Sequence, residues 1–167
     1  IYDTSDSQAV VKRILKEMNL DEKAFPYRAV LTEISRAKDS GITPEQYLAR
    51  AQATHNPRSI RIGEVYQTYW QRLFSAGAMD FDDLIYNTVR LLDEHEDVRE
   101  HWQRRFRYVL IDEYQDTNNL QYQLAALLAD GWGNICVVGD DDQSIYKFRG
   151  ADITNILNFE KEYKGCR

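Results

Sequence analysis

Long apolar segments are absent from this sequence. No run approaches the ~20 consecutive apolar residues that a membrane-spanning helix needs, so we predict no transmembrane helix and no membrane partner. No stretch combines the basic start, apolar centre and small-residue cleavage site of a secretory leader. The expected location of the protein is therefore the cytoplasm.

Cysteine and histidine are scarce, with two and three residues in a chain of 167. Cys136 falls inside a predicted core strand and Cys166 lies near the last residue, so neither a disulfide framework nor a zinc site is indicated. His55, His95 and His101 lack the spacing of metal ligands, and we expect them on the surface.

An excess of positive charge is also absent, since the formal net charge is −6. Residues 1–76 carry 11 Lys or Arg against 9 Asp or Glu, whereas residues 77–167 carry 10 against 18. The first part is therefore mildly basic, which permits phosphate contacts there, and the acid is concentrated in the second part. The length suffices for one hydrophobic core or for two small ones.

Two amphipathic helices are predicted at the start of the chain. Apolar residues recur at helical spacing in residues 3–18, where Ser7 or Asp6 is the candidate N-cap. The same spacing recurs in residues 29–37, and Gly41 is the expected stop of this second helix.

Two further helices are predicted before residue 77. Thr43 and Pro44 are typical of an N-cap and of the first helical position, and this helix is expected to run to about Ala53. A turn at Asn56-Pro57 precedes a longer amphipathic helix. Its expected buried stripe consists of Ile62, Val65, Tyr66, Tyr69, Trp70, Leu73 and Phe74.

The second part is predicted to begin at Gly77 and to open with helices. Asp80 has the position of an N-cap, because acidic residues and then apolar residues at helical spacing follow it as far as Leu92. Residues 96–105 continue as helix, and residues 153–159 form a last amphipathic helix.

Two short apolar runs in the second part each end in acidic residues. Residues 108–111, YVLI, lead into Asp112-Glu113, and residues 135–138, ICVV, lead into Gly139-Asp140. Such runs are typical of strands buried on both faces. Residues 120–128 have helical spacing, so we predict a βαβ unit with parallel strands and a right-handed crossover. Both acidic ends then fall at the carboxyl edge of the sheet, where ligands bind.

This acidic edge suits the hydrolysis of a nucleoside triphosphate. Asp112 could hold Mg²⁺ through its waters, since this hard ion prefers oxygen ligands and keeps much of its hydration. Glu113 could orient and deprotonate the attacking water, and the amide of Gln143 could sense a terminal phosphate without adding negative charge. The alternative is that acids simply end a buried strand where it meets solvent, which a short motif alone does not exclude.

The sequences of four segments resemble motifs of a known family. Residues 112–118, DEYQDTN, and 137–152, VVGDDDQSIYKFRGAD, resemble motifs II and III of the UvrD/Rep/PcrA group of superfamily 1 DNA helicases. Residues 80–84, DFDDL, resemble a further signature of that family. Residues 34–38, ISRAK, resemble its helical 1B subdomain. The resemblance is strong from residue 80 to residue 152 and looser before that.

The resemblance implies an α/β fold. A helical 1B-like subdomain is expected over residues 1–76. Part of the 1A motor domain, a parallel RecA-like P-loop NTPase sheet with flanking helices, is expected over residues 77–167. In the family, ATP hydrolysis drives translocation on single-stranded DNA in the 3′ to 5′ direction and unwinding at junctions with duplex DNA.

The resemblance also implies roles at the nucleotide, with ATP and Mg²⁺ as cofactors. Asp112 matches the magnesium carboxylate and Glu113 the catalytic base of the family. Gln143 matches the γ-phosphate contact that couples the ATP state to DNA, and Arg149 belongs to the same coupling segment.

Contacts with DNA are implied at four residues. Tyr146 and Phe148 match aromatic residues that stack on bases of the tracked strand, which suits a motor because stacking tolerates any base. Arg36 and Lys38 are candidate phosphate contacts in the 1B-like part. For the aromatic pair the alternative is core packing, and for the basic pair it is an ordinary solvated helix face.

The chain departs from the family in a few places. Lys147 stands where the family more often has Arg, and Phe148 where it more often has Trp. Because Phe keeps the stacking face but offers less area, base contacts are expected to be weaker. Asp141-Asp142 differ from the Pro-Lys of RecB-type subunits, which disfavours a helicase–nuclease subunit.

The phosphate-binding loop GxxxxGK(S/T) occurs nowhere in the chain. We therefore expect a fragment of a helicase that is inactive alone, with this loop upstream. The remaining alternative is a non-catalytic homologue that binds DNA or a partner protein.

Overall fold

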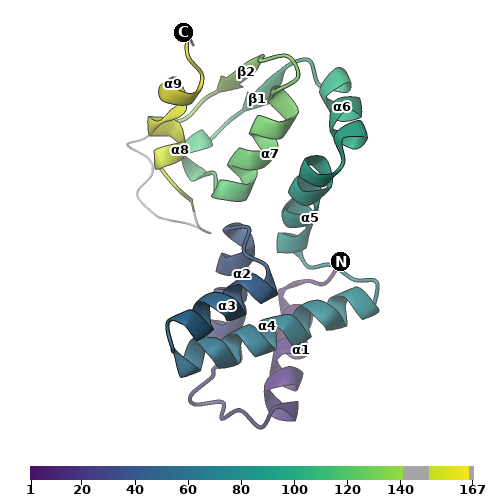
Figure 1. Ribbon diagram of the computed structural model, residues 1–167, viewed down its shortest axis with the longest axis vertical. Coiled ribbons are helices and arrows are strands. Elements are labelled where there is room, and N and C mark those ends of the chain that lie inside the picture. The colour runs from purple at the N-terminus through teal and green to yellow at the C-terminus, as the bar shows by residue number, and fades with distance from the viewer. Residues whose placement is uncertain (141–150, 166–167) are drawn as a thin grey trace. The chain divides into compact units, whose positions relative to one another are not determined.

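The structure is a computed structural model that describes residues 1–140 and 151–165 (Figure 1). It is predominantly helical with a small parallel sheet, and the chain divides into two compact units, Ile1–Leu84 and Ile85–Arg167. Within the described ranges, no helix is both long and apolar enough to cross a membrane.

The first unit contains the four helices that were predicted. They are α1 (Thr4–Glu17), α2 (Tyr27–Asp39), α3 (Pro44–Ala53) and α4 (Pro57–Ser75). Thr43 caps α3 through a capping box with Gln46, and Asn56 caps α4 with Pro57 at its first position. The predicted cap of α1 was wrong, because Asp3 accepts the N–H groups of Ser5 and Asp6. The buried Ser7 is instead part of the face that packs inward.

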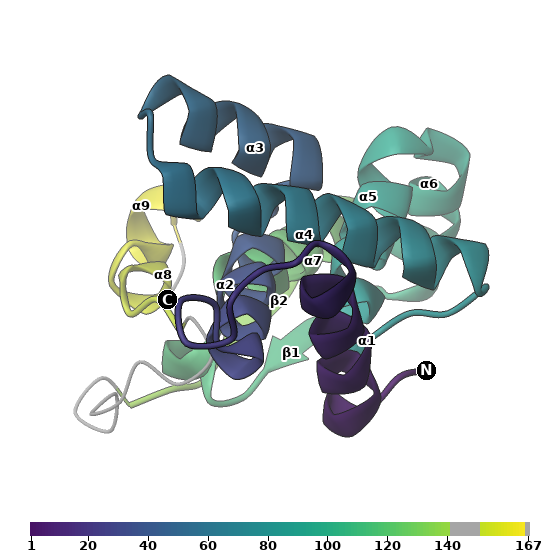
Figure 2. The same cartoon turned by 90° about the horizontal axis from the view of Figure 1, so that it is seen from below.

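Helix α4 lies along the other three helices, and Figure 2 shows α3 beside it. The shared core is apolar and consists of Val11, Ile14, Leu15, Val30, Ile34, Ala37, Ile62, Val65, Tyr66, Tyr69 and Leu73. The predicted stripe of α4 is thus confirmed at most positions. It was wrong for Phe74, which is 73% exposed and stacks on the half-buried Trp70 in the last turns of the helix.

The link between α4 and α5 (Phe81–Glu94) turns at Gly77, whose φ of +59° favours glycine. The N-terminal segment pairs with this link, since the N–H of Tyr2 donates to the carbonyl of Met79 at 2.8 Å. The division between the two compact units falls within α5, after Leu84, and the predicted subdomain boundary at residue 77 stays a prediction. The first turn of α5 therefore belongs with the helices before it.

The second unit contains the rest of α5, α6 (Glu96–Arg105) and a βαβ unit. Strand β1 (Val109–Ile111) pairs in parallel with β2 (Ile135–Val137), and α7 (Asn119–Ala129) connects them, as predicted. A single-turn 3-10 helix, η1 (Tyr114–Asp116), follows β1.

Apolar side chains of α5 and α7 form the core of this unit, around Tyr86, Val89 and Leu120. The predicted last helix is two short ones, α8 (Thr154–Leu157) and α9 (Phe159–Glu162), separated at Asn158.

The expectation that both faces of the strands are buried was wrong. Leu110 is 74% exposed, and Cys136, which pairs with it, is exposed as well. The alternating residues Val109 and Ile111 are half-buried, and β1 contacts α7. Among the described residues the sheet therefore has one covered face and one open face.

The capping box of α3 gives a first prediction. Replacing Thr43 by Ala removes the acceptor of the Gln46 N–H at 3.2 Å, so the free energy of unfolding should fall by about 1 kcal/mol. Urea unfolding followed by far-UV circular dichroism measures this change. The exposed Gln71→Ala on α4 is the matched control and should change stability by less than about 0.5 kcal/mol. Equal effects of the two variants would contradict the assignment of the cap.

Candidate functional site

The carboxyl ends of β1 and β2 meet at one edge of the sheet. Pairing continues past the strands, because the Val138 N–H donates to Ile111 O at 2.8 Å and the Tyr114 N–H donates to Val138 O at 2.9 Å. Asp112 and Glu113 therefore leave β1 next to the segment Gly139-Asp140 that leaves β2. The expectation that both acidic ends share one edge is confirmed for these residues.

Glu113 turns the chain sharply at this edge. Its φ of 52° and ψ of 41° lie in the left-handed region, which costs roughly 1 kcal/mol or more for a residue other than glycine. The Glu113 N–H donates to Asp112 Oδ1 at 2.9 Å, which holds the Asp112 carboxylate at the end of the strand. Both acidic side chains remain exposed to solvent.

Gln115 lies beneath the acid pair and was not predicted from the sequence. Its side chain is buried, with 1% exposed. Its Nε2 donates to Glu113 Oε2 at 2.7 Å, and its Oε1 accepts the N–H of Asp140 at 3.0 Å. One amide thus joins the Glu113 carboxylate to the chain that follows β2. The only sequence signal for a role of Gln115 was its position in the DEYQD motif.

The polar residues that follow Gln115 in this segment, Thr117 and Asn118, form hydrogen bonds that stabilise the local structure. Asn118 caps α7 through a capping box with Gln121. The carbonyl of Thr117 accepts the N–H of Asp152 at 3.0 Å and the side-chain amide of Asn155 at 3.1 Å. These bonds attach the segment before α8 to the turn after β1.

The acid pair fits a magnesium ion that is held mainly by water and phosphate. Asp112 is an exposed carboxylate, and none of the ion pairs of residues 1–140 and 151–165 involves Asp112 or Glu113. These ranges also contain no group of three His, Cys, Asp or Glu that could enclose a metal. Mg²⁺ in nucleotide sites commonly uses one or two carboxylates and keeps several waters, which agrees with this donor set.

The other predicted nucleotide and DNA contacts of the second part lie outside the described residues. They are Gln143, Tyr146, Phe148 and Arg149. Their roles stay predictions.

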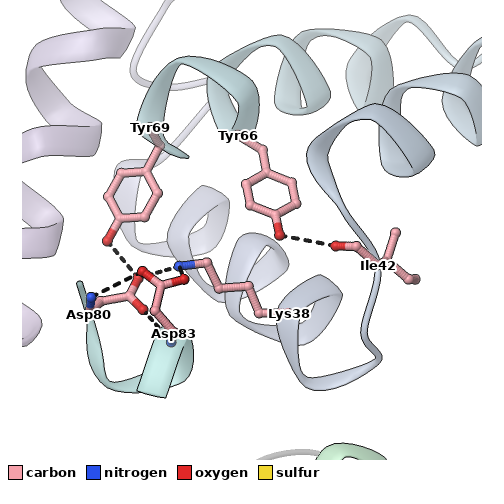
Figure 3. Close-up of polar contacts among 6 residues, drawn as sticks. All are labelled: Lys38, Ile42, Tyr66, Tyr69, Asp80 and Asp83. Carbon is pink, nitrogen blue, oxygen red and sulfur yellow. Dashed lines mark hydrogen bonds and ion pairs between the residues drawn. The ribbon is translucent and has the colours of Figure 1, made fainter. Parts of the chain in front are cut away.

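A second polar cluster is buried in the first unit, at the start of α5 (Figure 3). The Lys38 ammonium lies 2.6 Å from Asp80 Oδ2 and 2.7 Å from Asp83 Oδ1, and all three side chains are at most 8% exposed. Asp80 and Asp83 also form a reciprocal cap, because each accepts the backbone N–H of the other. The Tyr69 hydroxyl donates to Asp80 Oδ2 at 2.8 Å.

The electrostatics of this cluster are dominated by burial and by the single ammonium. Burial acts to raise the pKa of Asp80, but the charge and hydrogen bond of Lys38 outweigh it and hold this pKa below 3.8. Burial raises the pKa of Asp83, and the neighbouring Asp80 charge adds to this against the attraction of Lys38. Burial and the Asp80 carboxylate raise the pKa of Tyr69, so its hydroxyl stays a donor.

The contacts of this cluster contradict the predicted role of Lys38 and confirm the predicted cap at Asp80. Lys38 is buried, and its ammonium is enclosed by two carboxylates. The prediction that it contacts a DNA phosphate was therefore wrong, and so was the alternative of a solvated helix face. Arg36 on the same helix is exposed, and its phosphate contact stays a prediction. The predicted capping role of Asp80 is confirmed.

Comparison with known proteins gives consistent matches over nearly the whole chain. The model of the UvrD/REP helicase N-terminal domain matches residues 1–164. The chain is 48% identical over 163 residues to the ATP-dependent DNA helicase PcrA of Bacillus subtilis, covering 98% of this chain and 22% of that protein. It is 45% identical, with the same coverage, to proteins of that name from Staphylococcus epidermidis and Staphylococcus aureus. The chain thus spans about a fifth of the length of these relatives.

The ion cluster predicts a large, pH-dependent loss of stability in Lys38→Met. Two buried carboxylates lose their cation, so unfolding should become easier by roughly 3–5 kcal/mol near pH 7. Without the ammonium, burial raises the pKa of both acids above the unfolded value of 3.8, so the folded variant binds protons more readily. Its deficit against the natural chain should therefore shrink as the pH falls from about 7 to about 4.

Urea unfolding of Lys38→Met at several pH values measures this deficit. In the natural chain, the lowered pKa of Asp80 contributes stability that is present above pH 3.8 and is lost as the pH falls through the folded value. The raised pKa of Asp83 acts in the opposite sense. Arg36→Met, on the exposed face of the same helix, is the control and should change stability by less than about 0.5 kcal/mol. A deficit that is independent of pH would contradict the assignment.

Two buried tyrosines allow a matched comparison within α4. The Tyr69 hydroxyl donates to a buried carboxylate, whereas the Tyr66 hydroxyl donates to the neutral carbonyl of Ile42 at 3.0 Å. Since hydrogen bonds to charged groups are stronger, Tyr69→Phe should cost about 2 kcal/mol and Tyr66→Phe about 1 kcal/mol of unfolding free energy. The same unfolding measurement applies, and the reverse order would argue against a charged Asp80.

Proposed function

Since this chain belongs to the UvrD/REP helicase family, we propose that its full-length protein is an ATP-dependent DNA helicase. The single observation that supports this most is the acid pair Asp112-Glu113 at the carboxyl edge of β1, next to the chain that leaves β2. In this proposal the protein couples ATP hydrolysis to translocation on single-stranded DNA. It moves 3′ to 5′ and unwinds duplexes from junctions.

Glu113 is the proposed catalytic base. Its carboxylate is exposed, so an attacking water can approach it, while one of its oxygens accepts the bond from Gln115. Asp112 is the proposed magnesium carboxylate. Bound Mg²⁺ would neutralise the charge that develops on the phosphate oxygens.

Coupling to DNA is assigned to the segment after β2. Gln143 contacts the terminal phosphate, and Arg149 belongs to the same segment. Tyr146 and Phe148 stack on bases of the tracked strand, an interaction worth roughly 1–3 kcal/mol per base. The exposed Arg36 contributes a phosphate contact in the helical part, which positions the DNA without specifying its sequence.

The chain is proposed to supply only part of the motor. Residues 1–76 correspond to the 1B-like subdomain and residues 77–167 to part of domain 1A with motifs II and III. Because GxxxxGK(S/T) is absent from the sequence, the cradle for the ATP phosphates comes from elsewhere in the full-length protein. The 167-residue chain alone should therefore neither hydrolyse ATP nor unwind DNA.

The decisive variant is Glu113→Gln in the full-length protein. It removes the proposed base while keeping the size of the side chain, so the DNA-stimulated rate of ATP hydrolysis should fall by roughly 10²–10⁴-fold with ATP binding retained. Steady-state hydrolysis with single-stranded DNA and fluorescent-nucleotide titration measure the two quantities.

Asp130→Asn is the control for this experiment, since it neutralises an exposed acid just after α7, before β2, and should leave the rate unchanged. If the natural protein shows no DNA-stimulated hydrolysis, the catalytic proposal fails. The non-catalytic homologue that binds DNA or a protein partner then takes its place.

A further inference from the structure

We infer that Gln115 is a positioning residue for ATP hydrolysis, which orients the Glu113 carboxylate and ties it to the chain that leaves β2. The inference rests on the proposed function, because it concerns the same site. It goes further by assigning a role to a residue that does not touch the nucleotide in that proposal.

The chemistry of the two partners selects a primary amide at this position. The Glu113 carboxylate can only accept a hydrogen bond, and the backbone N–H of Asp140 can only donate one. Gln115 offers a donor at 2.7 Å from the first and an acceptor at 3.0 Å from the second. These opposite demands fix which end of the amide faces which partner, so the side chain has one favourable orientation.

Burial makes this bridge rigid. A side chain that is 1% exposed cannot replace lost partners with bulk water, and a buried amide without hydrogen bonds is costly. The packing around it is also close. A Cβ added to Gly139 would lie 2.5 Å from Gln115 Oε1 and 2.9 Å from Ile156 Cδ1. The absence of a side chain at residue 139 therefore lets the amide reach the Asp140 N–H.

Among the described residues, Gln115 is the side chain that limits the Glu113 carboxylate most closely. The Glu113 side chain is exposed, and the only side chain that bonds its carboxylate in the interactions of the described residues is Gln115. A general base must lie within hydrogen-bond reach of its water, and a misplacement of about 1 Å can cost on the order of a hundredfold in rate. Holding one carboxylate oxygen restricts the rotamers that Glu113 can adopt.

The bond from the Asp140 N–H to Gln115 Oε1 also links the Glu113 carboxylate to the chain after β2. Asp140 directly precedes the segment that contains Gln143, the proposed phosphate contact. A displacement of the Asp140 backbone would move Gln115 Oε1 and, through the rigid amide, the Glu113 carboxylate. The orientation of the base would thereby depend on the position of the Asp140 backbone.

Two variants of the full-length protein separate the two bonds. Gln115→Met keeps the volume and removes both bonds. Gln115→Glu keeps an acceptor for the Asp140 N–H. Burial and the Glu113 charge raise the pKa of the new carboxyl, so it loses the donor to Glu113 only where it is ionised, and this variant is assayed at about pH 9 as well as at about pH 6. DNA-stimulated hydrolysis is measured against ATP concentration, and kcat is normalised to the ATP sites titrated with a fluorescent ATP analogue. Gln115→Met should lower kcat by roughly ten- to a hundredfold, and Gln115→Glu should do so at about pH 9 but less at about pH 6, each relative to the natural protein at the same pH. KM for ATP should change by less than about threefold.

A double variant provides the readout that a merely structural role would not produce. If Gln115 acts through Glu113, adding Gln115→Met to Glu113→Gln should lower kcat by less than about twofold further. Asn155→Ala is the matched control. It breaks the bonds to Thr117 in the same unit without touching Glu113, so it should leave kcat within about twofold.

Several outcomes would overturn the inference. They are an unchanged kcat in Gln115→Met, an unchanged kcat in Gln115→Glu at about pH 9, a shift of KM alone, or losses that multiply in the double variant. Failure of both single variants to yield ATP-binding protein would make Gln115 a folding residue only. Absence of turnover in the natural protein would instead reject the proposed function itself.

Discussion

The parallel pairing of β1 with β2 is the constraint on which the candidate site depends. Because both strands run in the same direction, their carboxyl ends lie at one edge, and a helix must return the chain between them. The left-handed turn at Glu113 keeps the main chain close to β2, so Tyr114 can bond to Val138. That bond carries Gln115 inward, beneath Glu113. Acid pair, buried amide and Asp140 are brought together by two three-residue strands.

Each unit of the chain also contains a buried polar group whose partners are distant in sequence. The Lys38 ammonium bonds to Asp80, 42 residues away, and the Gln115 amide bonds to Asp140, 25 residues away. Apolar burial supplies most of the folding free energy, but it tolerates many arrangements of similar volume. A buried charge or amide does not, since each alternative arrangement leaves it without partners. We therefore interpret both groups as determinants of local geometry.

The two clusters suggest a division of labour in the proposed motor. The Lys38 cluster stabilises the start of α5, in the DFDDL segment. Because its three charged side chains are buried against one another, none of them is available to DNA or nucleotide. The edge of the sheet, in contrast, leaves Asp112 and Glu113 exposed, and the proposed function assigns them to a metal ion and to water. The charges of the Lys38 cluster are neutralised inside the protein, whereas those of Asp112 and Glu113 are not paired in any ion pair of the described residues.

The sequence by itself determined the features that depend on neighbouring residues. Helical periodicity located the first four helices, local cap chemistry identified Thr43 and Asp80, and apolar runs with an intervening helix identified the βαβ unit and its acidic edge. Each of these signals lies within about one helix or strand of the residue that it describes.

Only the tertiary structure decided which surfaces and side chains meet. Periodicity states that Phe74 and Leu110 are apolar, but not whether another element covers them, and both are exposed. Lys38 was expected on a helix surface, but its ammonium is enclosed by two carboxylates at the start of α5. The sequence assigned no contact to Gln115, whose bond to Asp140 depends on the pairing of β2 with β1. The partners of these side chains lie tens of residues away, so no local pattern specifies them.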